Sequence, residues 1–554
     1  MHPRQHIADL PVILYKKGIA DIIISPGSRN APLINSFMRV FGERCHSIVD
    51  ERSAGYVALG LAVSSKRPVT LLCTSGTAAL NYAPAVAEAF HQGIPLIIIT
   101  ADRPPEWIDQ QDNQTIRQAG IYAANVKAIF SMPVEVRLDA ECWHARRMAN
   151  EACNVAMSGR PGPVHINVPL REPLYEEIPV PEEAGCIRIS ASNTFNEPGD
   201  HLKKAWKEAR NILLIAGQQP CNKDLSHWLE LLSRDQRICI IGEPVSNIRV
   251  KGMIGNPDLL LAMDEDQHNL DPDLLIYFGG QVVSSRLKQF LRSCGTKSSW
   301  YIDAGGRHVD TFQHLTDVIQ ADPIHFFEWL SSAEGGQASD YRQQWQEHAD
   351  QMNTVIGAMT GAIEYSDLGI IQRISAALPA EATLFTGNST VVRMIGFFPP
   401  SCREIYSNRG TSGIDGCIST AVGIAMANTG MVFTLVGDQS FIYDSNALWN
   451  RSLPENLKII VVNNQGGGIF GLLEGPSSTP AYIPYLLAHH PASISELSAA
   501  FGVQYHACRN YHDFDDAFEN FVREKGPSVF EIMTSHEINT RVFRNFVINL
   551  KKRE

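Results

Sequence analysis

The chain has 554 residues, of which 44% are hydrophobic and 19% charged. This length exceeds what one hydrophobic core usually supports, and the composition is that of ordinary globular proteins, so we expect about three domains. The formal net charge of −12 argues against a nucleic-acid partner. No apolar run approaches the ~20 residues that span a bilayer, which argues against membrane insertion.

The first part of the chain, residues 1–180, alternates short β-branched runs with helix-like segments. Its strand candidates are DIIIS, HSIVD, VTLLCTS, PLIIIT and PVHINV. Such alternation is typical of a mostly parallel sheet covered by helices on both faces. The acidic, proline-containing stretch 175–185 indicates a linker to the next domain.

Two further segments, 187–335 and 341–554, repeat this alternation. The strand candidates of the first are NILLIAG, ICIIGE, LLIYFGG, SSWYIDAGG and DVIQADP, and those of the second are TLFTGN, EIYSN, MVFTLVGD, LKIIVVNN and PSVFEIMT. The second opens with a helix that Ser366 or Asp367 caps. We therefore predict an α/β fold of three tandem doubly wound domains. The basic end of the chain, RVFRNFVINLKKRE, predicts an amphipathic helix that packs on the core or covers a cleft.

Ligands of doubly wound sheets bind at the carboxyl ends of the strands. Asp438 directly follows one such strand, and Asn464 follows another 26 positions later, before a glycine-rich loop. A carboxylate there would repel a phosphate unless a divalent cation such as Mg²⁺ or Mn²⁺ lay between them. We predict that Asp438, the Asn464 amide and a backbone carbonyl near Gly466 bind this cation and thereby a diphosphate. The alternative is a simple turn and a flexible loop.

This spacing resembles the GDG–NN signature of thiamin diphosphate (ThDP) enzymes, with Gln439 in place of the last glycine. The resemblance implies a catalytic glutamate in the first domain that hydrogen-bonds the pyrimidine ring of the cofactor. Glu51 in SIVDERSAG is the candidate, and burial would give it the raised pKa that this role needs. We expect Asp50 beside it to be structural.

The same resemblance implies further cofactor contacts at Ser75, Gly437, Ile469 and Phe470. Ser75 and Thr77 are alternatively helix caps. In the ThDP superfamily the first domain of one subunit meets the third domain of its partner. The resemblance therefore implies a homodimer or homotetramer with active sites at the subunit interface.

Longer motifs narrow the resemblance. ISPGSRNAPL, ITADRPPEWID with NQTIRQ, GNSTVVRM and YSNRGTSGIDG together resemble the 2-succinyl-5-enolpyruvyl-6-hydroxy-3-cyclohexene-1-carboxylate (SEPHCHC) synthase family of menaquinone biosynthesis. Its members decarboxylate 2-oxoglutarate on ThDP and add the succinyl carbanion to isochorismate. Both substrates are dicarboxylic acids, which arginine forks bind well. The implied substrate-binding residues are Ser28, Arg29, Arg103, Gln114, Arg286, Ser389, Arg393, Arg409 and Leu473.

Within this set the resemblance assigns Arg29, Arg103 and Gln114 to isochorismate, and Ser389, Arg393 and Arg409 to the ketoacid. Ser28 either bonds to the intermediate or caps the next helix. One departure concerns the middle domain, where the family carries adjacent Lys-Arg. This chain has Ser285-Arg286, so contact of that loop with isochorismate is open, and Lys288 would substitute if the register differs.

Eleven dispersed cysteines indicate reduced thiols in a cytoplasmic protein. Three other functions are weighed against the synthase. One is a different ThDP-dependent ketoacid decarboxylase or acetolactate-type carboligase, which arginine-rich loops argue against. Another is a nucleotide-binding oxidoreductase or Rossmann-like module, which lacks support because no G-x-G-x-x-G or P-loop motif is present. The last is a regulatory homologue that has lost catalytic activity, and the presence of Glu51, Asp438 and Asn464 argues against it.

Overall fold

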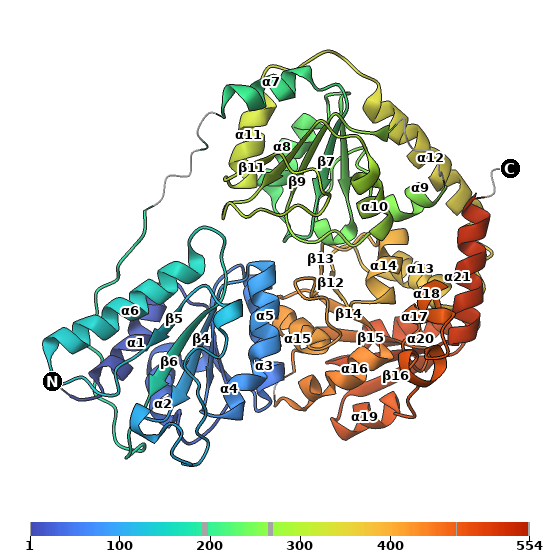
Figure 1. Ribbon diagram of the computed structural model, residues 1–554. Coiled ribbons are helices and arrows are strands. Elements are labelled where there is room, and N and C mark those ends of the chain that lie inside the picture. The colour runs from blue at the N-terminus through green and yellow to red at the C-terminus, as the bar shows by residue number, and fades with distance from the viewer. Residues whose placement is uncertain are drawn as a thin grey trace.

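The computed structural model describes residues 2–182, 184–190, 195, 198–263, 270–451, 453–472 and 474–551. These residues form three α/β domains, each built on its own sheet (Figure 1). Every strand pair in the described residues is parallel. The predicted fold class of three tandem doubly wound units is therefore confirmed.

The N-terminal domain, blue in Figure 1, has a six-stranded sheet in the order β2-β1-β3-β4-β6-β5. Alternate residues of its strands point to opposite faces: Ile97 and Ile99 pack under α1, α2 and α6, whereas Leu96 and Ile98 pack under α3 and α5. The elements are α1 (Gln5–Lys16), β1 (Ile22–Ile24), α2 (Ala31–Phe41), β2 (Cys45–Ser47), α3 (Glu51–Ser65), β3 (Val69–Cys73), α4 (Thr77–Asn81), α5 (Ala83–Gln92), β4 (Leu96–Asp102), β5 (Ile129–Ser131), α6 (Asp139–Met157) and β6 (Val164–Pro169).

The middle domain has a five-stranded sheet in the order β11-β10-β9-β7-β8. Its elements are α7 (Asp200–Glu208), β7 (Ile212–Ala216), α8 (Lys223–Leu232), β8 (Ile238–Gly242), α9 (Pro257–Met263), β9 (Leu274–Phe278), α10 (Ser285–Ser293), β10 (Ser298–Ile302), β11 (Asp317–Ile319) and α11 (Pro323–Ser332). The next helix, α12 (Tyr341–Thr360), packs against α9 and β8 and also touches α21. The domain limits predicted from the sequence stay predictions.

The C-terminal domain has the strand order β13-β12-β14-β15-β17-β16, which repeats the topology of the N-terminal sheet. Ser366, not Asp367, caps its first helix by accepting a hydrogen bond from the Gly369 N–H at 3.3 Å. The elements are α13 (Asp367–Ala377), β12 (Thr383–Thr386), α14 (Thr390–Phe397), β13 (Glu404–Tyr406), α15 (Cys417–Ala427), β14 (Val432–Gly437), α16 (Asp438–Tyr443), β15 (Leu457–Asn463), α17 (Ile469–Leu472), α18 (Glu474–Ser477), α19 (Ile494–Ala500), β16 (Gln504–Cys508), α20 (Tyr511–Arg523), β17 (Ser528–Met533) and α21 (His536–Lys551).

Two strands, β5 and β16, were not among those predicted, and both lie at the edge of a sheet. Their mixed polarity reflects that position, because in β5 only Phe130 is buried and most of β16 is partly exposed. Helix α21 packs on the core, where Val542, Phe546 and Leu550 are buried. All eleven cysteines are free. Among the described residues, no helix combines the length and apolarity needed to cross a membrane.

The N- and C-terminal domains meet where α3 crosses α15, at the centre of Figure 1. The crossing is close because a glycine stands at the contact on each helix. A Cβ at Gly60 would lie 1.9 Å from the Thr420 carbonyl oxygen, and a Cβ at Gly423 would lie 2.0 Å from the Val57 carbonyl oxygen. No other residue fits at either position without separating the helices.

We expect Gly423→Ala to destabilise the protein by about 1–3 kcal/mol, because the added methyl meets backbone that cannot move without shifting a domain. Gly357→Ala in the exposed part of α12 is the matched control, since no atom lies within 4 Å of its added Cβ. The control should be neutral or gain up to ~1 kcal/mol from helix propensity. Denaturant and thermal melts of both variants measure this, and equal melting temperatures for the two would contradict the packing described.

Candidate active site

Asp438 stands at the first position of α16, directly after β14. Its Oδ1 accepts a hydrogen bond from the Gln439 N–H at 2.6 Å, and its Oδ2 accepts one from the Gly466 N–H at 2.9 Å. His490 Nε2 lies 3.3 Å from the same Oδ2. The side chain is 2% exposed, and this burial raises its pKa to about 6. The carboxylate and the glycine-rich loop after β15 therefore meet, as predicted.

Asn464 lies at the end of the neighbouring strand, β15. Its Nδ2 donates a hydrogen bond to Asp367 Oδ2 at 2.9 Å, and Asp367 Oδ1 accepts another from Thr534 Oγ1 at 2.5 Å. The Asn464 Oδ1 is buried and has no hydrogen-bond partner among the described residues. Because a carboxylate only accepts, Asp367 engages the amide nitrogen and leaves the amide oxygen for another ligand.

The two side chains line one pocket together with Asn388, Ser389 and the glycines 466–468. A Cβ at Gly466 would lie 2.4 Å from the Leu487 carbonyl oxygen, so the loop requires glycine there. A buried carboxylate, an unpaired amide oxygen and close-approaching backbone fit a hard divalent cation that carries a diphosphate. No cluster of three or more His, Cys, Asp or Glu side chains that could hold a metal occurs among the described residues. The cation would thus depend on this mixed set of oxygens.

Four of the motifs contain a non-glycine residue with positive φ, among them Gln114 at +54°, Ser389 at +71°, Ser412 at +61° and Gln465 at +64°. Residues other than glycine seldom adopt this backbone conformation, because it is strained and surrounding contacts must hold it. Such residues are concentrated at functional sites. Ser389 and Gln465 flank the pocket of Asp438 from β12 and β15. Gln114 lies in the N-terminal domain, close to Gly76.

Glu51 begins α3 at the carboxyl end of the N-terminal sheet. Asp50 is the N-cap and accepts a hydrogen bond from the Ser53 N–H at 3.1 Å, which gives it the structural role expected. Glu51 is half-buried, and that burial raises its pKa. Within one chain it is absent from the residues that line the pocket of Asp438. Glu51 and Asp438 therefore do not share a pocket in a single subunit.

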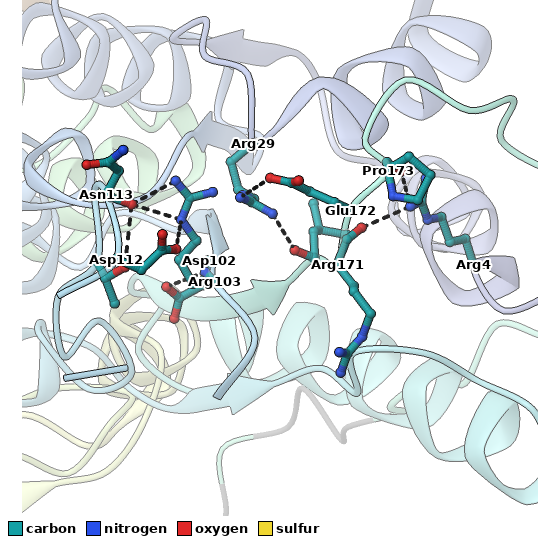
Figure 2. A network of polar contacts seen from close by, with 11 residues as sticks. Arg4, Arg29, Asp102, Arg103, Asp112, Asn113, Arg171, Glu172 and Pro173 are labelled. Atoms are coloured by element: carbon teal, nitrogen blue, oxygen red, sulfur yellow. Dashed lines mark hydrogen bonds and ion pairs between the residues drawn. The ribbon is translucent and has the colours of Figure 1, made fainter. Parts of the chain in front are cut away.

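Figure 2 shows Arg29 and Arg103 close together, in the loops that follow the carboxyl ends of β1 and β4. Arg29 is buried and donates to the Leu170 carbonyl oxygen at 2.8 Å and to Glu172 Oε1 at 3.1 Å. Arg103 donates to the Asn113 carbonyl oxygen and lies 3.3 Å from Asp112 Oδ2. Both guanidinium groups thus have protein partners, and their predicted contact with isochorismate stays a prediction.

The predicted helix caps in this region are wrong. Gly76 is the N-cap of α4, so neither Ser75 nor Thr77 caps it. Ser75 is 1% exposed, and its Oγ has no partner among the described residues. Ser28 does not cap α2 either, since Asn30 is the N-cap there and no side chain forms a capping hydrogen bond.

The predicted ketoacid residues lie where the C-terminal and middle domains meet. Arg409 Nη1 donates to Asn388 Oδ1 at 2.9 Å, and Arg393 on α14 lines a cleft with Asp258 of the middle domain. Arg286 forms an ion pair with Asp258 at 2.9 Å. Lys288, two positions further along α10, is partly buried, and its pKa is lowered by that burial and by Arg409 and Arg393 nearby. Lys288 is therefore within electrostatic range of two of the predicted arginines.

Of the remaining candidates, Ile469 and Phe470 form the start of α17 and are partly exposed. Leu473 lies outside the described residues. Sequence reasoning missed the roles of Asp367 and Asn388, which hold Asn464 and Arg409. Asn388 lies in the quoted GNST motif, but nothing in the sequence pairs it with Arg409. Asp367 appeared only as a helix cap.

Three family models match consecutive parts of the chain: "Thiamine pyrophosphate enzyme, N-terminal TPP binding domain" over residues 7–121, "Middle domain of thiamine pyrophosphate" over 193–386 and "Thiamine pyrophosphate enzyme, C-terminal TPP binding domain" over 386–532. A relative from Desulfotalea psychrophila is 40% identical over 96% of this chain and 98% of its own. Another from Cytophaga hutchinsonii is 38% identical over 98% of each chain, and one from Bacteroides thetaiotaomicron is 34% identical over 99% of each. All three are named 2-succinyl-5-enolpyruvyl-6-hydroxy-3-cyclohexene-1-carboxylate synthase. With full-length similarity at this level, the chain belongs to the SEPHCHC synthase family of thiamine pyrophosphate enzymes.

Proposed function

We propose that this chain decarboxylates 2-oxoglutarate and joins the remaining succinyl unit to isochorismate, giving SEPHCHC and CO₂ in menaquinone biosynthesis. It does so as a transferase that uses ThDP and a divalent cation, Mg²⁺ or Mn²⁺. The observation that supports this most is the pocket that joins buried Asp438 to the unpaired oxygen of Asn464, in a chain similar to SEPHCHC synthases along its whole length.

The residues divide the work as follows. Asp438, Asn464 and the Gly466 carbonyl would hold the cation and through it the diphosphate. Glu51, with its raised pKa, would hold or release a proton at the pyrimidine ring. When bound, ThDP supplies the thiazolium that accepts the electron pair released by decarboxylation. Arg393, Arg409 and Lys288 provide positive charge, which suits a dicarboxylic donor better than pyruvate and so disfavours an acetolactate-type enzyme.

We also propose that the working form is at least a homodimer. Glu51 is absent from the residues that line the pocket of Asp438 in one chain. The N-terminal and C-terminal sheets share one topology, and their domains meet where α3 crosses α15. A second copy related by a two-fold axis could bring its Glu51 to the pocket of Asp438, and an isologous contact would then complete two sites at once.

An assay of the purified chain tests the proposed function. With ThDP and Mg²⁺, 2-oxoglutarate and isochorismate together should give CO₂ and SEPHCHC, whereas pyruvate should not replace 2-oxoglutarate. Glu51→Gln should lower turnover by at least ~10²-fold, because the amide cannot exchange the proton, with an unchanged melting temperature. Near-normal activity of Glu51→Gln, or a preference for pyruvate, would refute the assignment.

Asp367→Asn tests the cation site. The new amide no longer enforces one orientation of Asn464, so we expect the affinity for Mg²⁺ to fall about 10–100-fold, measured by titrating Mg²⁺ against the ThDP-dependent melting temperature. Glu531→Gln is the matched control, because Glu531 is also buried and accepts from Asn463 Nδ2 at 2.5 Å, one position before Asn464. An equal loss of Mg²⁺ affinity in both variants would show that Asp367 has no special role.

Mixing two inactive variants tests the shared site. If each site takes Glu51 from one subunit and Asp438 from the other, a mixed dimer of Glu51→Gln and Asp438→Asn chains has one intact site. Co-refolded equimolar chains should then recover roughly a quarter of the normal activity. Sites confined to single chains would recover none. Each variant alone is the control, and light scattering confirms the dimer.

A further inference from the structure

The loop 407–413, which carries Arg409, lies at the junction of the three domains. From the N-terminal domain, α5 contributes Glu88, and from the middle domain Gln218 donates to the Ser407 carbonyl oxygen at 2.6 Å. Within the C-terminal domain, Asn388 donates to the carbonyl oxygens of Asn408 and Gly413, each at 2.7 Å. The backbone on both sides of Arg409 is therefore fixed by side chains from other segments. Figure 1 shows α5 facing α15 at this junction.

Glu88 makes the contact of the N-terminal domain. It is 0% exposed, although a buried carboxylate is costly unless its oxygens are satisfied. Oε1 accepts from the Gly410 N–H at 2.6 Å and from Gln92 Nε2 at 2.5 Å, and Oε2 accepts from the Thr411 N–H at 2.6 Å and Thr411 Oγ1 at 2.5 Å. Among the described residues it forms no ion pair with a basic side chain. Of the four hydrogen bonds that the structure describes for this carboxylate, three thus come from the loop 407–413, two of them from backbone N–H groups.

The loop also fits against α5 sterically. A Cβ at Gly410 would lie 2.7 Å from the Glu88 carbonyl oxygen and 3.0 Å from its Oε1. The residue after Arg409 must therefore be glycine, so that the loop can approach the helix closely enough for both hydrogen bonds. The steric contact and the hydrogen bonds are thus two separate observations that both place the loop directly against α5.

Arg409 itself is 9% exposed and makes one side-chain hydrogen bond, to Asn388. Its Nε is buried and has no partner among the described residues. Burial lowers its pKa, and so does Arg393, whereas the Glu243 and Glu88 carboxylates act in the opposite direction. A guanidinium held by its backbone, with donors still free, is suited to receive a carboxylate in a single orientation.

We propose that Glu88 is a positioning residue for Arg409: by binding the 410–411 backbone across the domain boundary, it sets the direction from which Arg409 meets a substrate carboxylate. This inference rests on the proposed function. It implies that each N-terminal domain serves two sites, since Glu51 would act with the partner subunit and Glu88 acts within its own chain.

A double-mutant cycle tests the proposal. Glu88→Gln keeps the size of the side chain but presents an amide N–H₂ to backbone donors, and Thr411→Val removes one donor from the other side of the contact. We expect kcat/KM for 2-oxoglutarate to fall about tenfold in Glu88→Gln and less in Thr411→Val, mainly through KM. In an Arg409→Ala background either change should lower kcat/KM by less than a further factor of about two. The effects of substituting residues that act through one another are not additive.

Asp9→Asn is the control. Asp9 is likewise 0% exposed and accepts a backbone N–H, that of Glu182 at 2.9 Å, but it lies on α1, apart from the Arg409 loop. Its effects should add to those of Arg409→Ala. Hydrogen exchange at the Gly410 and Thr411 amides, faster in Glu88→Gln and unchanged in Asp9→Asn, gives a readout independent of catalysis.

The outcomes separate the two proposals. If the unaltered chain does not turn over its substrates, the proposed function fails and this inference fails with it. If the unaltered chain is active but the effects of Glu88→Gln and Arg409→Ala add, or if Glu88→Gln lowers only the melting temperature, the inference alone is overturned. Coupling in the cycle together with faster exchange at the two amides supports it.

Discussion

The direct backbone contact between α3 and α15 is the constraint on which the rest of the structure depends. Because Gly60 and Gly423 have no side chain, the backbone of each helix can approach the backbone of the other directly. Polar contacts then fix the register across the crossing: Tyr56 OH donates to Asp415 Oδ2 at 2.6 Å, and Ser419 Oγ donates to Ser53 Oγ at 2.9 Å. Because α3 begins at Glu51 and α15 follows the Arg409 loop, this crossing determines where both sets of functional side chains point.

The N-terminal and C-terminal domains repeat one topology, and each carries a different part of the candidate active site at the carboxyl ends of its strands. The N-terminal half carries Glu51 and the cluster around Arg29 and Arg103. The C-terminal half carries the oxygens of Asp438 and Asn464. Glu51 does not line the pocket of Asp438 in one chain, which is why we propose that a second copy completes the site.

An acidic protein that binds acidic substrates must create positive potential locally, and here two buried glutamates organise it. Glu88 accepts backbone N–H groups from the loop of Arg409, and Glu243 accepts the N–H groups of Val283 and Ser284 at 2.5 and 2.6 Å, just before the helix of Lys288. Burial raises the pKa of Glu243 to about 7. In both cases the carboxylate accepts hydrogen bonds from backbone N–H groups and forms no ion pair with a basic side chain among the described residues, which leaves the donors of the nearby basic side chain to a ligand.

The sequence alone determined the order of strands and helices, the three α/β units and the pairing of Asp438 with Asn464, because local periodicity and strand-end loops depend on neighbours in the chain. It did not reveal the edge strands β5 and β16, whose half-exposed residues lack a strong pattern. It also offered helix caps as alternative roles for Ser75 and Asp367, which neither residue has. Only the tertiary structure decided that Asp367 orients Asn464, that Lys288 lies beside Arg409 and that Glu88 holds the loop of Arg409. These contacts join residues from about one hundred to more than three hundred positions apart, and a contact across such a separation depends on how whole domains pack, which local patterns do not encode.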